Sequence, residues 1–428
     1  MTTRRDVRIL LRVSAIVGLA ATPLVAQTPV SLLVDGRASA NPSIVSRGQY
    51  VAIAWSAATA AAIDVYAALS RDTGKTFSAP VRVNDVPGDA RVNSEQPPRI
   101  AFIPGAKSNA IPAIVVVWTT KGSAGTRILS ARSTDGGRSF GKSTPVPGSD
   151  AAGSRGWESI GVDSRGRVLV LWLDHREAAN APGGMMHHDS SKSATTAPKA
   201  DPTERAALSK LYFASLDGSG ATPITKSVCY CCKTSLVIAG ENVYGVWRHV
   251  YPGSQRDIAF TVSHDGGRTF ASPVRVSDDG WHLDGCPENG PAVAVDAARR
   301  VHVVWPAPPD GKNETPLALF YASSADGKAF AKRAQLPAHG PAAHGQIVSD
   351  ASGSAIVAWD ETVNGTRRIA FARARVDNDG TPVFTPIAPP DAGDDRGWPV
   401  LAPASNGAIV AWVAGSGVGN AIRVSRIK

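Results

Sequence analysis

The sequence has little charge, few cysteines and, after its first residues, no long apolar run. Charged residues make up 19% of the 428 residues, and there are four cysteines. The formal net charge of +9 is spread through segments such as those around Lys75, Arg138 and Arg268. It forms no basic stripe, so nucleic-acid binding is not expected. No segment after residue 26 is apolar over a length that spans a bilayer. We expect a monomer without a membrane span.

The first 26 residues have the pattern of a signal peptide. Arg4, Arg5, Arg8 and Arg12 precede the apolar stretch 13–21, and Leu24-Val25-Ala26 offers a small-residue cleavage site. No cysteine lies near this site, which excludes lipidation there. We therefore expect an exported bacterial protein, periplasmic or extracellular, whose mature part is residues 27–428.

Seven short runs of β-branched and small apolar residues end in tryptophan. Their tryptophans are 53 to 75 residues apart: Trp55, Trp118, Trp172, Trp247, Trp305, Trp359 and Trp412. Other strand-like runs lie before and after each, as in NPSIV (41–45), IDVYAALS (63–70) and SAPVRV (78–83). Four short strands in a repeat of this length are typical of a β-propeller blade. The sequence predicts an all-β propeller of seven blades, with six as the alternative.

The last repeat ends after its third strand, at AIRVSRIK (421–428). TPVSLLV (28–34) resembles the closing strands of the other repeats and precedes the first full repeat. We expect it to complete the last blade, because this closes the ring and removes two free sheet edges.

A turn signature S-x-D-x-G-x-[ST]-F occurs between expected third and fourth strands. It reads SRDTGKTF at 70–77, STDGGRSF at 133–140, SHDGGRTF at 263–270 and, one residue shorter, SADGKAF at 324–330. These segments closely resemble the Asp-box of the sialidase (neuraminidase) superfamily. The resemblance implies a propeller whose ligands bind on the face opposite the Asp-box turns. We call this the top face. It is formed by the loops between blades and between second and third strands.

The resemblance to sialidases does not extend to their catalytic motif. Sialidases carry an Arg-Ile-Pro motif before the first Asp-box, whereas the arginines of the mature segment before Ser70 are Arg37 and Arg47, neither in such a motif. Without an identifiable arginine triad, we expect exo-sialidase activity to be weak or absent. A sialidase-type glycoside hydrolase remains an alternative function.

Two consecutive inter-blade loops contain all four cysteines: Cys229, Cys231 and Cys232, then Cys286. The pattern C-x-C-C-K-T, W-R-x-x-Y-P-G-x-x-R-D-I and D-G-W-x-x-D-G-C-P-x-x-G-P resembles exported bacterial sialidase-like proteins. An even number of cysteines in an exported protein favours a disulfide. Thiolates with neighbouring histidines also suit a soft metal, copper or else zinc. The predicted metal site is Cys229, Cys231, Cys232 and Cys286, with His282 and His249. The inserted loop 178–209 lies on the same face.

Three further tryptophans fall between the expected blades, two of them after Arg-Gly. Either they plug the blades or they form platforms on which sugar rings stack, while nearby arginines hold a carboxylate. Glu158 and Glu95 are candidate acid/base groups. The candidate ligand-binding residues are Arg155, Trp157, Glu158, Arg248, Trp281, Arg396 and Trp398.

These observations predict an exported propeller that binds a ligand on its top face near the junction of blades three, four and five. Cysteine, histidine and tryptophan side chains would bind either a glycan or a soft metal. A non-catalytic recognition module with structural disulfides is the remaining alternative.

Overall fold

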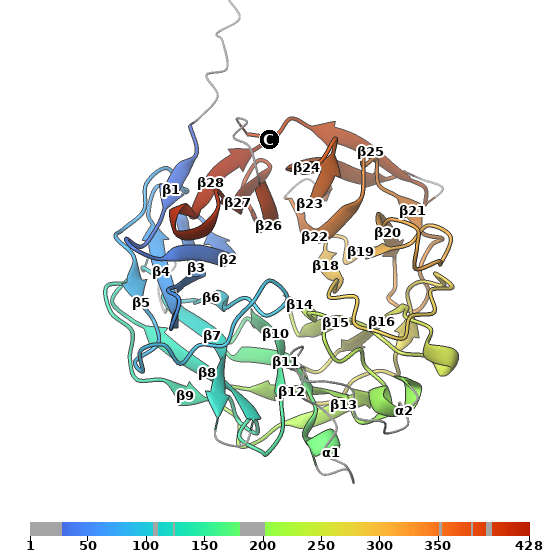
Figure 1. Cartoon of the computed structure of the whole chain (residues 1–428), viewed down its shortest axis with the longest axis horizontal. Helices are drawn as coiled ribbons and strands as arrows, with labels where there is room; N and C mark the ends of the chain where they lie inside the picture. Colours follow the sequence, from blue (N-terminus) through green and yellow to red (C-terminus); the bar gives the residue numbers. More distant parts are fainter. Residues whose placement is uncertain are drawn as a thin grey trace, which may run out of the picture.

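The computed structural model forms a closed ring of seven four-stranded antiparallel sheets around a central axis (Figure 1). It describes residues 28–105, 110–122, 125–179, 202–350, 353–377, 380–390 and 396–428. The expected signal peptide 1–26 and most of the inserted loop 178–209 lie outside these residues. No helix in the described ranges is long and apolar enough to cross a membrane.

The first three blades consist of consecutive strands. Blade one comprises β2 (Ala38–Arg47), β3 (Tyr50–Ala58), β4 (Ile63–Ser70) and β5 (Val81–Arg82). Blade two comprises β6 (Arg99–Ile103), β7 (Ala113–Gly122), β8 (Gly125–Ser133) and β9 (Thr144–Pro145). Blade three comprises β10 (Arg155–Val162), β11 (Val168–Asp174), β12 (Lys210–Ser215) and β13 (Thr222–Lys226), with the short helices α1 (Arg176–Ala179) and α2 (Pro202–Ala207) between β11 and β12.

The next three blades repeat this order. Blade four comprises β14 (Ser235–Ala239), β15 (Asn242–Arg248), β16 (Ile258–Ser263) and β17 (Val274–Arg275), with a 3₁₀ turn at Pro252–Ser254. Blade five comprises β18 (Ala292–Val295), β19 (Val301–Ala307), β20 (Ala318–Ser324) and β21 (Ala334–Gln335). Blade six comprises β22 (Ala342–Ser349), β23 (Ala355–Val363), β24 (Thr366–Val376) and β25 (Pro382–Ile387).

Blade seven joins the two ends of the described chain. It comprises β26 (Arg396–Pro403), β27 (Ala408–Ala414) and β28 (Ala421–Ile427), with a 3₁₀ turn at Gly417–Gly419, and its outer strand is β1 (Val30–Leu32). Leu32 pairs with Ile422, and Val30 pairs with Val424. The predicted seven-bladed ring and its closure by the N-terminal strand are confirmed.

The repeated tryptophans occupy the second strand of every blade and are almost completely buried. Large buried side chains fill the space between adjacent blades, which is why each repeat depends on its neighbours. The Asp-box phenylalanines belong to the same layer. Phe270 lies edge-on to Phe213 of blade three at 5.0 Å, and Phe330 meets Phe260 of blade four at 5.3 Å. These phenylalanines therefore connect blades.

Each Asp-box turn is held by its own aspartate. In blade one, Asp72 Oδ1 accepts hydrogen bonds from Ser70 Oγ at 2.7 Å and from the backbone N–H of Thr76 at 2.9 Å. The Thr76 hydroxyl donates to Asp72 Oδ2 at 2.6 Å, and its hydrogen bond is the main reason that the pKa of Asp72 is lowered to about 2. The aspartate is thus occupied in shaping the turn.

Four innermost strands carry a β-bulge whose residue has a positive φ. These residues are Asn41 (φ 53°), Trp157 (56°), His344 (51°) and Trp398 (50°). Trp157 and Trp398 were expected in inter-blade loops, and this expectation is wrong, because both lie within the inner strands β10 and β26. A bulge redirects the side chain out of the regular alternation of the strand. Non-glycine residues whose backbone has a left-handed conformation are also common at functional sites.

Candidate functional site

The two cysteine-bearing loops lie side by side and are joined covalently. One loop connects β13 to β14 and the other connects β17 to β18, so they enclose blade four. Cys231 and Cys286 form a disulfide with their Cα atoms 6.1 Å apart. The Tyr230 hydroxyl donates a hydrogen bond to the Gly285 carbonyl at 3.3 Å. The structure thus brings together loops whose cysteines are 55 residues apart.

A buried carboxylate from a third loop fixes the spacing of these two loops. Glu95 Oε2 accepts a hydrogen bond from the backbone N–H of Lys233 and another from that of Gly290, both at 2.9 Å. The loops approach so closely that a Cβ at position 290 would lie 2.2 Å from the Lys233 carbonyl oxygen. Only glycine fits there. Glu95, an acid/base candidate in the sequence, therefore braces the loops.

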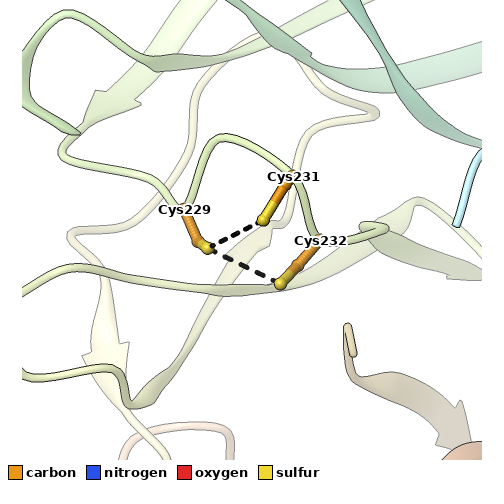
Figure 2. Close-up of side chains that lie close together, drawn as sticks. All are labelled: Cys229, Cys231 and Cys232. Atoms are coloured by element: carbon orange, nitrogen blue, oxygen red, sulfur yellow. Dashed lines mark hydrogen bonds between the residues drawn. The ribbon is translucent and has the colours of Figure 1, made fainter. Parts of the chain in front are cut away.

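Three cysteine sulfurs, one of which is the Cys231 sulfur of the disulfide, form a compact buried group (Figure 2). Cys229 Sγ lies 3.5 Å from Cys232 Sγ and 3.8 Å from Cys231 Sγ. The three sulfurs all lie within 4.8 Å of one another, and Cys229 and Cys232 are free thiols. We call Cys229, Cys231 and Cys232 the sulfur group. Its geometry allows it to hold a metal ion.

Two buried arginines face the sulfur group without a carboxylate partner in the described part of the chain. Arg256 Nη1 lies 3.4 Å from Cys229 Sγ, and Arg256 Nε donates to the Leu283 carbonyl at 3.1 Å. Arg248 donates to the carbonyls of Asn289, Arg256 and Pro306. Both arginines are almost completely buried. Buried cations are normally paired with negative charge, and the group of this kind that Arg256 contacts is the sulfur of Cys229.

The electrostatics separate the two free thiols. The pKa of Cys229 is lowered to about 6, chiefly by the hydrogen bond from Cys232 and further by the positive charges of Arg256 and Arg248, against the effect of burial. The pKa of Cys232 is raised well above its usual value by burial and by its hydrogen bond to Cys229. At neutral pH this pair carries one negative charge, on Cys229.

The histidines predicted as metal ligands lie outside the sulfur group. His249 Nδ1 accepts a hydrogen bond from Trp247 Nε1 at 3.3 Å, and its ring contacts that of Tyr251 with centroids 4.5 Å apart. Burial, and next the charge of Arg275, lowers the pKa of His249 to about 4. His282 is exposed, and its Nδ1 lies 2.9 Å from the Gly253 carbonyl oxygen. The expected shell of histidines is therefore replaced by sulfur and guanidinium groups.

A cavity of about 210 Å³ opens on the top face beside the disulfide. Its lining residues come from five connections that lie on this face, together with the start of β8 and β10: Arg91, Asn93, Gln96, Gly125, Thr126, Ser154, Arg155, Trp157, His175, Tyr230, Cys231, Cys286 and Glu288. The Trp157 ring lies against His175, with centroids 5.3 Å apart. The cavity thus extends from the cysteine loops toward blades two and three.

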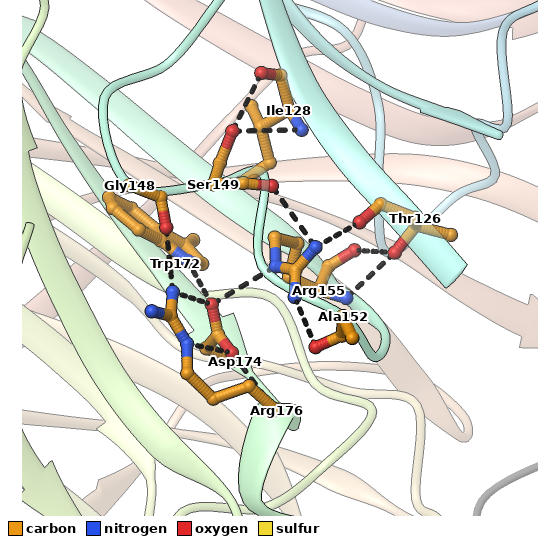
Figure 3. Close-up of polar contacts among 9 residues, drawn as sticks. All are labelled: Thr126, Ile128, Gly148, Ser149, Ala152, Arg155, Trp172, Asp174 and Arg176. Carbon is orange, nitrogen blue, oxygen red and sulfur yellow. Dashed lines mark hydrogen bonds and ion pairs between the residues drawn. The ribbon is translucent and has the colours of Figure 1, made fainter. Parts of the chain in front are cut away.

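Arg155, a candidate carboxylate-binding residue, is already occupied (Figure 3). Its Nε donates to Asp174 Oδ2 at 3.1 Å, and its Nη atoms donate to the carbonyls of Thr126, Ser149 and Ala152. Asp174 also accepts hydrogen bonds from Trp172 and Arg176. Arg155 therefore ties β8 and the loop before β10 to the end of β11. Arg91 is the other arginine among the cavity's described lining residues, so they contain no arginine triad.

The remaining ligand-binding candidates lie elsewhere on the top face. Glu158 is buried, accepts a hydrogen bond from Thr119 at 3.0 Å, and has its pKa raised by burial. Trp281 is buried and donates to Asn313 Oδ1 at 2.7 Å, with Arg248 over its ring. Trp398 stacks under Arg367, with the Arg367 guanidinium carbon 3.9 Å from the centroid of its ring. Arg396 begins β26, and its side chain lies outside the described part. Of the six candidates whose side chains the structure describes, Arg155 and Trp157 line the cavity.

Sequence reasoning missed several residues that form the site. Arg256 and Tyr230 were not singled out, although both stand inside the motifs W-R-x-x-Y-P-G-x-x-R-D-I and C-x-C-C-K-T. The signal that could have identified Arg256 is its position in the first of these motifs, where it is the arginine of R-D-I. Arg91 and Glu288 carry no sequence signal, because only the folded ring brings their loops to the cavity.

No protein-family model and no curated protein matches the chain. Among solved structures, it is similar to a polysaccharide lyase of family PL25, an ulvan lyase bound to -[GlcA(1-4)Rha3S]-, with a TM-score of 0.56 and 9% identity over 93% of this chain and 96% of the other. It is also similar to the polysaccharide lyase Uly1, with a TM-score of 0.52 and 9% identity over 91% and 90% of the chains. For the Hadza microbial sialidase Hz136 the TM-score is 0.47, with 15% identity over 86% and 74%. What is shared is the propeller fold. At these identities, structural similarity is evidence of a shared fold and not of a shared activity.

Proposed function

We propose that this protein is an exported binder of monovalent copper, which it holds at the sulfur group. The observation that carries the proposal is the pair of buried free thiols, Cys229 and Cys232, 3.5 Å apart beside a third sulfur. Buried cysteines that serve only to fill a core do not need to converge on one point. Here three sulfurs do so, and one of them belongs to the Cys231–Cys286 disulfide, which closes one side of the group.

The donor atoms favour Cu(I) over Zn²⁺. Thiolate is a soft ligand that selects Cu(I), whereas zinc in structural sites takes four ligands in a tetrahedral arrangement. The described sulfur group offers two free thiols, with a third sulfur in the disulfide, and no imidazole joins them. Two or three sulfurs without nitrogen fit Cu(I) and leave a zinc ion short of ligands.

The charge around the group supports the same ion. Two thiolates and Cu(I) carry a net charge of −1, whereas two thiolates and Zn²⁺ are neutral. Arg256 and Arg248 are buried beside the group without carboxylate partners in the described chain. A cluster that stays negative after the metal binds stabilises these cations, whereas a neutral one gives them no such counter-charge.

The test is an anaerobic titration of untagged, chelator-free protein with Cu(I) in competition with a chromophoric Cu(I) chelator. We expect one Cu(I) per chain, with only sulfur in the copper X-ray absorption spectrum. The double variant Cys229→Ser/Cys232→Ser should lose the binding. His282→Gln, at the exposed histidine, is the matched control and should keep it. Binding that survives in the double variant, or nitrogen ligands in the spectrum, would contradict the proposal.

A second candidate function is favoured by the cavity beside Trp157. Its volume of about 210 Å³, one aromatic ring and the polar side chains of Arg91, Asn93 and Gln96 suit a sugar residue. An ulvan lyase of the same fold was solved with a uronic-acid saccharide bound. We propose a uronate-containing oligosaccharide as its ligand.

Calorimetric titration with uronate-containing and neutral oligosaccharides tests this second function. Trp157→Ala should abolish binding because the ring lines the cavity. Trp398→Ala should not, because Trp398 sits on an equivalent bulge but does not line the cavity. Equal loss in both variants would indicate general disruption of the top face.

A further inference from the structure

The disulfide beside the sulfur group is asymmetric in its exposure. Cys231 is 3% exposed, whereas Cys286 is only partly buried, and both line the top-face cavity. Cys229 and Cys232 do not line it. A molecule that enters the cavity therefore reaches the disulfide before it reaches the free thiols, and the accessible sulfur is that of Cys286.

The same disulfide controls how many thiolates the sulfur group can supply. While Cys231 is bonded to Cys286, only Cys229 and Cys232 are free. If the bond is cleaved, Cys231 becomes a third thiol whose sulfur lies 3.8 Å from that of Cys229. The group thus has two states, with two and with three available ligands.

We propose that the cavity is a reaction site for a low-molecular-weight thiol, which converts the copper site from two to three thiolates. The thiolate attacks Cys286 Sγ and forms a mixed disulfide with it. The Cys231–Cys286 bond breaks, and its electron pair leaves on Cys231 as a thiolate. One S–S bond replaces another, so no further oxidant or reductant is needed. This inference rests on the proposed function only for the role of the copper.

The surroundings favour attack at Cys286 rather than at Cys231. Thiol–disulfide exchange is faster when the attacked sulfur is accessible and the leaving sulfur is stabilised as a thiolate. Cys231 is almost completely buried, whereas Cys286 is only partly buried, so an incoming thiol reaches the sulfur of Cys286 more readily. Cys286, by contrast, remains at the cavity wall.

The cavity also indicates which thiols fit. It is lined by one exposed cation, Arg91, and one exposed carboxylate, Glu288. These charges complement the carboxylate and the ammonium group of an amino-acid thiol. Its volume of about 210 Å³ suits a thiol of the size of cysteine. We therefore expect zwitterionic aminothiols to react faster than uncharged thiols of similar acidity.

The exchange is tested on the full-length protein, without metal, under nitrogen. The protein is incubated with cysteine, the remaining thiols are alkylated, and the peptides are identified by mass spectrometry. We expect a mixed disulfide on Cys286 and a newly alkylated Cys231 in folded protein. A bond that resists cysteine until the protein is unfolded, or a mixed disulfide on Cys231, would overturn the proposal. Arg91→Gln should slow the reaction with cysteine about two- to five-fold and leave that with 2-mercaptoethanol unchanged. An equal effect of Arg91→Gln on the reactions with the two thiols would contradict the assigned thiol class.

The consequence for copper is measured separately. X-ray absorption should show two sulfur ligands before cysteine treatment and three afterwards. Cys286→Ser should show three without any thiol, because its Cys231 is always free. If copper binds with the same coordination in all three samples, the switch fails and the proposed function stands. If no sample binds Cu(I) but the mixed disulfide forms, the proposed function fails and the thiol site stands.

Discussion

Truncation of one residue in β1 tests how much the ring depends on its closing strand. Leu32 is 6% exposed and packs against Ile422 and Val413 of blade seven, whereas its neighbour Leu33 is 47% exposed. Leu32→Ala removes buried methyl groups and leaves a cavity, so it should lower the free energy of unfolding by about 2–4 kcal/mol. Leu33→Ala is the matched control and should change it by less than about 1 kcal/mol.

The measurement is scanning calorimetry of both variants. With an unfolding entropy of about 2.1 cal/mol/K per residue, a loss of 3 kcal/mol in a ring of about 400 residues corresponds to a decrease in Tm of roughly 3–4 °C. Equal shifts for the two variants, or none for Leu32→Ala, would refute the view that β1 is an integral part of the fold.

Three further predictions concern other parts of the ring. The pKa of His249 is lowered to about 4 in the native protein. As the pH falls below 6.5, the unfolded chain therefore binds a proton at this histidine that the native protein does not bind. Stability should therefore fall by up to about 3 kcal/mol between pH 6.5 and pH 4, and urea titrations of His249→Gln should show a flatter profile. Gly267→Ala would place a Cβ 2.4 Å from the Phe213 ring and should lower Tm markedly, whereas Gly365→Ala, with open space around it, should cost only about 1 kcal/mol. Asp174→Ala should destabilise the protein by about 3–5 kcal/mol in chemical denaturation, because it leaves a buried guanidinium without its counter-charge.

The fold could be predicted from the sequence because its signals are local and repeated. Each run that ends in tryptophan indicates the second strand of a blade. The truncated last repeat indicated that TPVSLLV is its missing strand, and the pairing of Leu32 with Ile422 confirms this. The meeting of the cysteines followed from the same reasoning, since consecutive inter-blade loops must lie next to each other around a ring.

The chemistry of the site could not be predicted to the same extent, because it depends on where side chains point. His249 and His282 lie near the cysteines in sequence, yet one ring turns to Tyr251 and the other to the Gly253 carbonyl. Arg155 has the appearance of a free cation in the sequence, but Asp174 and three carbonyls take its donors. These outcomes depend on contacts between residues far apart in sequence, and no short motif encodes them.

The pairing of β1 with β28 also sets the order in which the ring can be completed. Blades one to six each consist of consecutive strands, so a chain that emerges from its N-terminus can form them one after another. Blade seven cannot follow this order, because Val30–Leu32 must wait for Ile422–Val424 at the other end of the chain. Until then β1 is an unpaired edge, which is prone to wrong pairing with other chains. Correct folding of this protein is therefore decided only when its last strand becomes available.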